Sequence, residues 1–184
     1  MKLILIRHAK VNIRMPKRCN AKAFDDARAA YDRAPIRPVE TPLDPEAYPA
    51  ADFRFYVSTL HRTHETLHGL FGDVPFRETD LLTEVPNRSF SDKGPVLPYP
   101  CYQALGRVGW FLNLERQPEG RRATTARAEK LVRGLEKKDE DCVLVSHEFY
   151  LYTLLRVLKR HGFRVKRKNP FRIRNLEMIT AEKP

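Results

Sequence analysis

Polar side chains with catalytic potential follow three short apolar runs of the sequence. The polar groups that follow these runs are Arg7-His8, the segment Ser58–Arg62 and Ser146-His147. A histidine can act as a nucleophile, a general base or a metal ligand. An arginine beside it offers a planar pair of donors that fits a phosphate or a carboxylate. These residue types therefore point to chemistry on an anionic substrate.

Strands that end at a common edge would bring these residues together. We expect buried strands at about 2–6 and 142–145, because each is a short apolar run, and a further strand at 53–57, which is rich in aromatic residues. Helices are expected at about 21–31, 58–71, 103–115, 124–137 and 149–160, and two edge strands at 163–168 and 172–180. This alternation predicts an α/β fold with a largely parallel sheet, whose ligands bind at the carboxyl ends of the strands.

The chain length of 184 residues suits one domain, and we expect a single domain over residues 1–184. Two proline-rich stretches, near 35–49 and 86–100, are expected to be loop excursions over its surface. The three cysteines are far apart in the sequence and form no CxxC pair. They predict reduced thiols rather than a disulfide scaffold or a thiolate zinc site.

Four segments, taken in order, resemble the histidine phosphatase superfamily, the phosphoglycerate mutase-like enzymes. They are LILIRHAK at 3–10, STLHRTHE at 58–65, LTE at 82–84 and VLVSH at 143–147. Each segment is short, but their order and their places after expected strands make the combination specific. The resemblance spans residues 2 to about 158. It implies a three-layer α/β sandwich around a largely parallel central sheet.

The resemblance also implies a function: a metal-independent phosphomonoester hydrolase of the histidine acid phosphatase type. His8 would attack the phosphorus, and water would then hydrolyse the phosphohistidine. Arg7, Arg62 and His147 would bind the phosphoryl oxygens and stabilise the transition state. The two arginines should lower the pKa of His8, because like charges disfavour its protonation. No cofactor is implied, and the substrate would be a phosphorylated small molecule or a phosphoprotein.

A general acid is needed to protonate the leaving oxygen, and the resemblance assigns this role to Glu84. Glu78 is the alternative acid, because the residues after Glu84 depart from the family pattern. A carboxyl group that gives up a proton near neutral pH must hold that proton in the substrate complex. We therefore expect a bell-shaped pH profile with an optimum on the acid side.

Two further residues depart from the family pattern near the expected phosphate pocket. Arg14 stands where the family often has asparagine, and its charge could either join the pocket or face water. Glu148 stands directly after His147, where the family prefers glycine. A carboxylate at that place would repel a phosphate unless it is turned away or paired.

Three other functions remain open from the sequence. Phosphoglycerate mutase-type phosphotransfer is possible within the family, and a non-catalytic phosphate- or nucleic-acid-binding module would keep the same basic pocket. The segment His64–His68 also reads HExxH, the pattern of zinc metallopeptidases. A catalytic zinc needs a third protein ligand, and position 74, where the extended pattern has histidine, is Val74. We therefore expect no metal site.

The chain is basic, with a formal net charge of +11 and its richest basic stretch between Arg156 and Arg174. No nucleic-acid-binding motif is visible, so we expect a solvated surface that attracts anionic small molecules rather than a nucleic-acid site. No apolar run approaches the roughly 20 residues of a membrane span or the roughly 7–15 of a secretory signal. We expect a cytoplasmic protein without a membrane partner, and the oligomeric state stays open.

Overall fold

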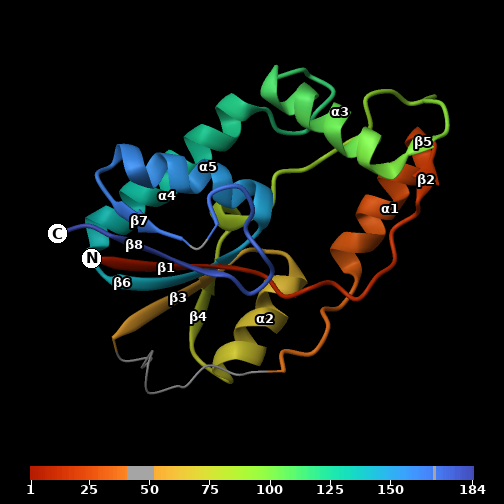
Figure 1. Ribbon diagram of the computed structural model, residues 1–184. Helices are drawn as coiled ribbons and strands as arrows, with labels where there is room; N and C mark the ends of the chain where they lie inside the picture. Colours follow the sequence, from red (N-terminus) through yellow and green to blue (C-terminus); the bar gives the residue numbers. More distant parts are fainter. Residues whose placement is uncertain (41–51, 168) are drawn as a thin grey trace.

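A computed structural model describes residues 1–40, 52–167 and 169–184 (Figure 1). Its elements along the chain are β1 (Lys2–Arg7), β2 (Arg18–Cys19), α1 (Ala21–Arg33), β3 (Phe53–Val57), α2 (His61–Phe71), β4 (Phe76–Glu78), the short 3₁₀ helix η2 (Asp80–Leu82), β5 (Leu97–Pro98), α3 (Tyr99–Phe111), α4 (Arg121–Lys138), β6 (Asp141–Ser146), α5 (Glu148–Arg160), β7 (Arg164–Lys166) and β8 (Met178–Glu182).

A six-stranded sheet in the order β4-β3-β6-β1-β8-β7 forms the centre of the fold. The four strands β4, β3, β6 and β1 run parallel, whereas β8 is antiparallel to β1 and β7 is antiparallel to β8. The expected α/β fold with a largely parallel central sheet is therefore confirmed. The three buried parallel strands lie within a residue or so of their predicted places, because the two runs at 2–6 and 142–145 are apolar and the run at 53–57 is mostly aromatic.

Helices cover both faces of this sheet, which gives three layers (Figure 1). The side chains of β1 alternate between them, as the twofold repeat of a strand requires. Leu3 and Leu5 pack in one core cluster with α4 and α5, whereas Ile4 and Ile6 pack in another with α2. All four side chains are at most 1% exposed. Each buried aliphatic chain of this size stabilises the fold by about 1.5–3 kcal/mol.

Two local predictions need correction, and one strand was not predicted. The second C-terminal strand was expected at the sheet edge over 172–180, but β8 begins at Met178 and pairs on both sides, with β1 and β7. The residues before it instead contact the end of β1, where Leu176 N donates to Arg7 O at 2.9 Å. The α2 helix begins at His61, and neither Ser58 nor Thr59 caps it. The edge strand β4 has no alternating pattern and was not predicted.

Both proline-rich stretches were predicted to be loops, and the structure bears this out only in part. Residues 35–40 are irregular, and Ile36 bridges Val11, whereas 41–49 lie outside the described residues. The second stretch is irregular only up to Val96, because β5 and α3 begin inside the expected loop. Pro100 is tolerated in the first turn of α3, where its missing N–H has no helical partner in any case.

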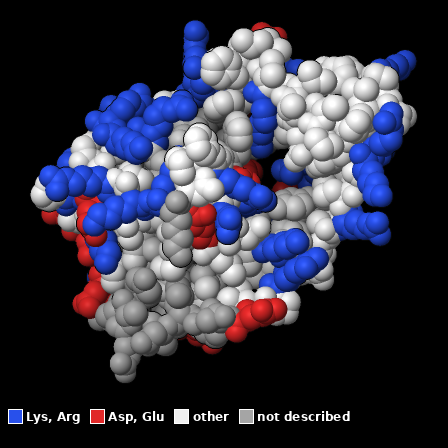
Figure 2. Space-filling view, viewed as in Figure 1, with Lys and Arg blue, Asp and Glu red and all other residues white. Residues whose placement is uncertain are grey.

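The helices α1 and α3 lie beyond the carboxyl ends of the parallel strands (Figure 1). They are joined by a small aromatic core, in which the Phe24 ring lies 5.1 Å from that of Tyr99 and 5.4 Å from that of Tyr102. The two-stranded sheet β2-β5 closes this unit. Figure 2 shows the surface hollowed between it and the end of the central sheet. No helix among the described residues is long and apolar enough to cross a bilayer.

Candidate active site

The parallel register places three polar segments at one edge of the sheet. Arg7 at the end of β1 stands opposite Ser146 at the end of β6, and Val57 at the end of β3 stands opposite Val145. The His8 backbone N–H donates to Ser146 O at 2.9 Å, which ties the first residue beyond β1 to the end of β6. Residues that follow these strands therefore meet, although they are far apart in the sequence.

The two predicted histidines lie against each other at this edge. The rings of His8 and His147 have their centroids 5.1 Å apart. The Arg62 guanidinium joins them, because its Nε donates to His147 Nδ1 at 3.2 Å. Relative exposures are 2% for His8, 1% for Arg62 and 0% for His147. The structure thus gathers two imidazoles and a guanidinium in one buried group.

The hydrogen bond of His8 fixes which ring nitrogen is free. Its Nδ1 lies 2.7 Å from Ala9 O, and a carbonyl oxygen can only accept, so Nδ1 carries the proton. In the neutral ring, Nε2 then keeps its lone pair. Burial, reinforced by the charges of Arg62 and Arg7, lowers the pKa of His8 to about 3. The predicted influence of the two arginines is confirmed, and burial adds a larger one.

His147 has the opposite tautomer. Its Nδ1 accepts from Arg62, so its Nε2 carries the proton and donates to Ser58 Oγ at 2.7 Å. Burial, reinforced by the charge of Arg62, lowers the pKa of His147 well below the ordinary value. Both ring nitrogens are therefore engaged by the protein. The expected donation from His147 to phosphate requires the other tautomer, which the Ser58 hydroxyl permits because it can donate as well as accept.

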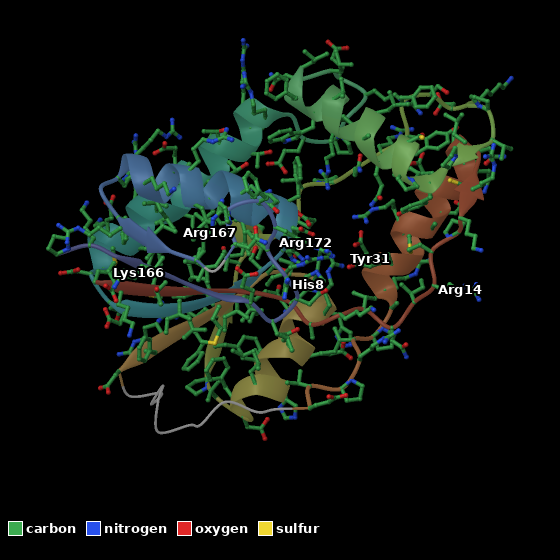
Figure 3. The ribbon with its side chains drawn as sticks, viewed as in Figure 1. His8, Arg14, Tyr31, Lys166, Arg167 and Arg172 are labelled. Carbon is green, nitrogen blue, oxygen red and sulfur yellow. The ribbon has the colours of Figure 1, made fainter. Side chains whose placement is uncertain are left out.

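A cavity of about 500 Å³ opens beside His8. Its lining comes from the end of β1, from α1 and α3, and from the start of α5, and includes Arg7, His8, Arg28, Tyr31, Glu84, Arg107, Glu148 and Tyr152. In Figure 3, Tyr31 projects from α1 toward His8. Arg62 and His147 are outside this lining, so among the predicted phosphate ligands Arg7 alone borders the described cavity.

Arg7 and Glu148 form an ion pair at the cavity wall. Arg7 Nη1 lies 2.7 Å from Glu148 Oε2 and also donates to Ile173 O at 2.6 Å. Arg7 Nε is buried and, among the described residues, has no hydrogen-bond partner. Of the two arrangements open to Glu148, the structure shows the paired one. An unsatisfied buried donor is costly, and an acceptor that reached Arg7 Nε would remove this cost.

Glu84 lies at the N-terminus of α5. Its Oε1 accepts from the backbone N–H groups of Val85 at 2.9 Å and Tyr150 at 3.0 Å, whereas Oε2 has only a longer contact of 3.4 Å with Phe149 N. Oε2 is therefore the less engaged of the two carboxylate oxygens. The alternative acid, Glu78, lies in β4, outside the cavity lining, and pairs with His64 at 2.9 Å.

No protein-family model and no curated protein matches the chain. Solved structures match over nearly its whole length. They include phosphoserine phosphatase from Entamoeba histolytica (18% identity, TM-score 0.57, covering 97% of this chain and 89% of that one). The Rv3214 product of Mycobacterium tuberculosis is also similar, at 17% identity and a TM-score of 0.53, covering 97% of this chain and 89% of that one. Bacillus stearothermophilus YhfR is similar at 19% identity and a TM-score of 0.53, covering 86% of this chain and 80% of that one. The chain has the fold of the histidine phosphatases. At these identities the similarity establishes the fold alone.

Two arginines that the sequence analysis did not single out complete the cavity of this histidine phosphatase fold. Arg28 lies 5.2 Å from the Tyr31 ring on α1, and Arg107 of α3 stacks on Phe149 at 3.6 Å. Burial lowers the pKa of Arg107 to about 10. Within the described parts of the chain, neither guanidinium forms an ion pair. No local pattern marks these residues, because they reach the cavity only through the packing of α1 and α3.

Arg14 does not join the cavity. Its side chain is exposed and, in Figure 3, lies away from His8 on the far side of α1. Of the two possibilities left open for Arg14, the structure shows it facing water. Arg62, by contrast, is buried and forms an ion pair with Asp32, in which Arg62 Nη1 lies 2.8 Å from Asp32 Oδ1.

The HExxH segment lies on α2 with its histidines engaged elsewhere. His64 Nε2 lies 2.9 Å from both Ser58 O and Glu78 Oε2, and His68 pairs with Asp73 at 3.0 Å. Over residues 1–40, 52–167 and 169–184, no three His, Cys, Asp or Glu side chains gather in a way that could hold a metal ion. We therefore interpret the HExxH pattern as part of the helix that carries Arg62.

Proposed function

We propose that the protein is a phosphomonoester hydrolase whose nucleophile is His8 Nε2. The observation that carries this proposal is the state of His8: its Nδ1–H is held by Ala9 O, its ring is neutral, and it borders a cavity. An imidazole needs a free lone pair to attack phosphorus, and the low pKa preserves that lone pair even in acid. A histidine-to-alanine variant of the Entamoeba histolytica phosphatase holds phosphoserine, a phosphomonoester.

In the first step, His8 Nε2 forms a bond to phosphorus while the bond to the leaving oxygen breaks. Glu84 Oε2 gives its proton to that oxygen, so the product departs as an alcohol. In the second step, a water molecule attacks the phosphohistidine and passes its proton to Glu84. The N–P bond breaks, and inorganic phosphate leaves with the enzyme in its starting state. No metal takes part in this scheme.

Charge on the phosphoryl oxygens is balanced by the arginines around His8. The unpartnered Nε of Arg7 supplies one donor. Arg62 and His147 supply others once the phosphoryl oxygens compete for them. For His147 this requires a change of tautomer, in which the Nε2 proton leaves to water, a proton from water binds Nδ1, and Ser58 turns its hydroxyl to donate to Nε2. Donors fixed in a buried site stabilise the transition state more than the same groups would in water.

The substrate in this proposal carries a second anionic group. Arg7 and Arg62 each have a carboxylate partner, Glu148 and Asp32. By contrast, Arg28 and Arg107 border the same cavity without an ion pair to any described residue. A largely buried, unpaired guanidinium is costly, and a carboxylate or a further phosphate on the leaving group would compensate it.

The decisive experiment traps the intermediate. The protein, in excess chelator, is mixed with a ³²P-labelled phosphomonoester and quenched in alkali or in acid. We expect label that survives alkali, is lost in acid and is absent from His8→Ala, which also loses turnover but still binds phosphate. His68→Ala is the matched control, because that histidine is exposed on α2, and it should be labelled normally. Undiminished turnover by His8→Ala would refute the proposal, and wild-type protein that binds phosphate without turnover would indicate a binding module.

A further inference from the structure

A second hollow, outside the candidate active site, lies between α4 and α5. Its volume is about 610 Å³. Its charged lining consists of five arginines and one glutamate, namely Arg121, Arg122, Arg133, Arg156, Arg160 and Glu129. The arginines come from both helices, so their concentration depends on how α4 packs against α5. Such a concentration of one charge sign attracts polyanions.

A third hollow, of about 330 Å³, lies between this region and the candidate active site. It shares Arg156 with the hollow between α4 and α5, and it shares Tyr152 with the cavity beside His8. Lys159 and Arg167 also line it. We call the seven cations of the two hollows the basic tract: Arg121, Arg122, Arg133, Arg156, Lys159, Arg160 and Arg167. Tyr152, Arg156 and Arg160 follow one another at turns of α5, over about 12 Å.

The charge of the basic tract is largely uncompensated. Glu129 pairs with Arg160 at 2.8 Å and with His161 at 2.7 Å. Among the residues that the structure describes, the other six cations of the tract form no ion pair. In Figure 2, lysine and arginine side chains gather over the region of α5 and β7. A chain of phosphates can therefore pair with the cations that line both hollows.

An exposed aromatic ring stands beside the basic tract. Phe171 is 88% exposed, the highest value among the exposed large apolar side chains of the described residues. Its backbone is fixed, because Tyr152 Oη donates to Phe171 O at 3.0 Å and Phe171 N donates to Asn169 Oδ1 at 2.8 Å. In Figure 3, Lys166, Arg167 and Arg172 follow one another along this segment toward His8.

We infer that the basic tract and Phe171 together bind single-stranded nucleic acid, with backbone phosphates on the arginines and a base stacked on the ring. A groove of cations with an aromatic platform is the usual basis of such binding. A lone exposed ring favours an unpaired base over a duplex, because the bases of a duplex are already stacked on one another. The sequence shows no nucleic-acid motif because the tract is assembled from two helices and a loop. This inference is independent of the proposed hydrolysis.

The test uses a fluorescein-labelled 12-nucleotide RNA without a terminal phosphate, so that the candidate active site has no substrate. We expect fluorescence anisotropy to show binding that weakens steeply with salt. Arg133→Glu/Arg156→Glu should weaken it roughly tenfold or more at 100 mM salt. The control Arg77→Glu/Lys93→Glu makes the same change of charge away from the tract, in β4 and in the loop before β5, and should bind like the wild type.

Phe171→Ala separates nucleic acid from other polyanions. We expect it to weaken RNA binding several-fold and to leave heparin binding unchanged, because heparin has no base to stack. All four charge-reversed side chains are exposed, and unchanged thermal unfolding will verify folding. The inference is overturned if RNA does not bind at 50 mM salt or if the control loses as much affinity. It is also overturned if duplex RNA binds as tightly, or if Phe171→Ala affects RNA and heparin alike. His8→Ala should bind RNA normally, whatever its effect on hydrolysis.

Discussion

The Glu148 carboxylate lies 2.7 Å from the Arg7 guanidinium, at the wall of the cavity beside His8. Glu148 is the first residue of α5, and Arg7 is the last residue of β1. The arginine closest in sequence to the proposed nucleophile is thus neutralised by a carboxylate before any anion enters. An incoming phosphate must share Arg7 with Glu148, and this competition can be measured.

Replacing Glu148 by glutamine should strengthen anion binding. Glu148→Gln removes a negative charge next to the proposed phosphate position and leaves Arg7 Nη1 without its anionic partner. We expect the inhibition constant of inorganic phosphate to fall about tenfold, equivalent to about 1.4 kcal/mol. Glu182→Gln is the control, because that carboxylate also pairs with a cation, Lys166, but far from the cavity. Unchanged or weaker phosphate inhibition in Glu148→Gln would mean that Glu148 positions Arg7 rather than competing for it.

Glu84 and Glu78 can be distinguished through the leaving group. Glu84→Gln keeps the shape of the side chain and an acceptor for Tyr150 N but cannot give up a proton. Hydrolysis of alkyl phosphates should fall by ~10²–10³-fold, while p-nitrophenyl phosphate, whose leaving group needs no protonation, should lose much less. Glu78→Gln should leave both rates at the wild-type level, since Glu78 lies outside the cavity. Equal losses for both substrates would argue against Glu84 as the acid.

The unpaired arginines predict selectivity for a second anion. Arg107→Gln should raise KM for phosphomonoesters whose leaving group bears a carboxylate by roughly tenfold, the worth of one charge-assisted hydrogen bond. KM for a phosphate ester of a neutral alcohol should change little. Arg88→Gln is a suitable control, because Arg88 is exposed outside this cavity. A uniform rise in KM for both substrates would show that Arg107 only maintains the cavity.

The buried state of His8 predicts loss of stability in acid. The pKa of His8 falls from 6.5 to about 3 on folding, so below pH 6.5 the unfolded chain binds a proton that the folded chain does not. Its contribution is therefore present above pH 6.5 and is lost progressively as the pH falls toward 3. Linkage gives about 2 kcal/mol between pH 7 and pH 5. Thermal unfolding at these two values should show the loss, and His8→Gln should reduce it.

The exposed His68 provides the comparison for that measurement. His68→Gln removes an imidazole from the surface of α2 rather than from the buried group, so the drop in Tm between pH 7 and pH 5 should match that of the wild type. A drop that His8→Gln leaves unaltered would contradict the burial of a neutral His8. The same low pKa predicts that phosphatase activity persists at pH 5, in line with an acid-side optimum.

Much of the site could be anticipated because strands place their successors at a defined edge. The runs before Arg7, Ser58 and Ser146 are mostly apolar, which favours buried, parallel strands whose carboxyl ends lie at the same edge of the sheet. A positive charge next to His8 could be predicted because Arg7 directly precedes it in the sequence. For the same reason, segments without a clear period were misplaced. The start of α3 and the position of β8 depend on contacts with distant parts of the chain.

The sequence by itself determined the fold class, the edge of the sheet at which the candidate site lies and the two histidines that meet there, because apolar runs and their polar ends are local features. Only the tertiary structure decided the protonation pattern of each ring, the pairing of Arg7 with Glu148 and the entry of Arg28 and Arg107 into the cavity. These features depend on distances between side chains that are remote in the sequence. The strength of an electrostatic interaction depends on the distance between the charged groups, and the packing of helices and strands sets that distance.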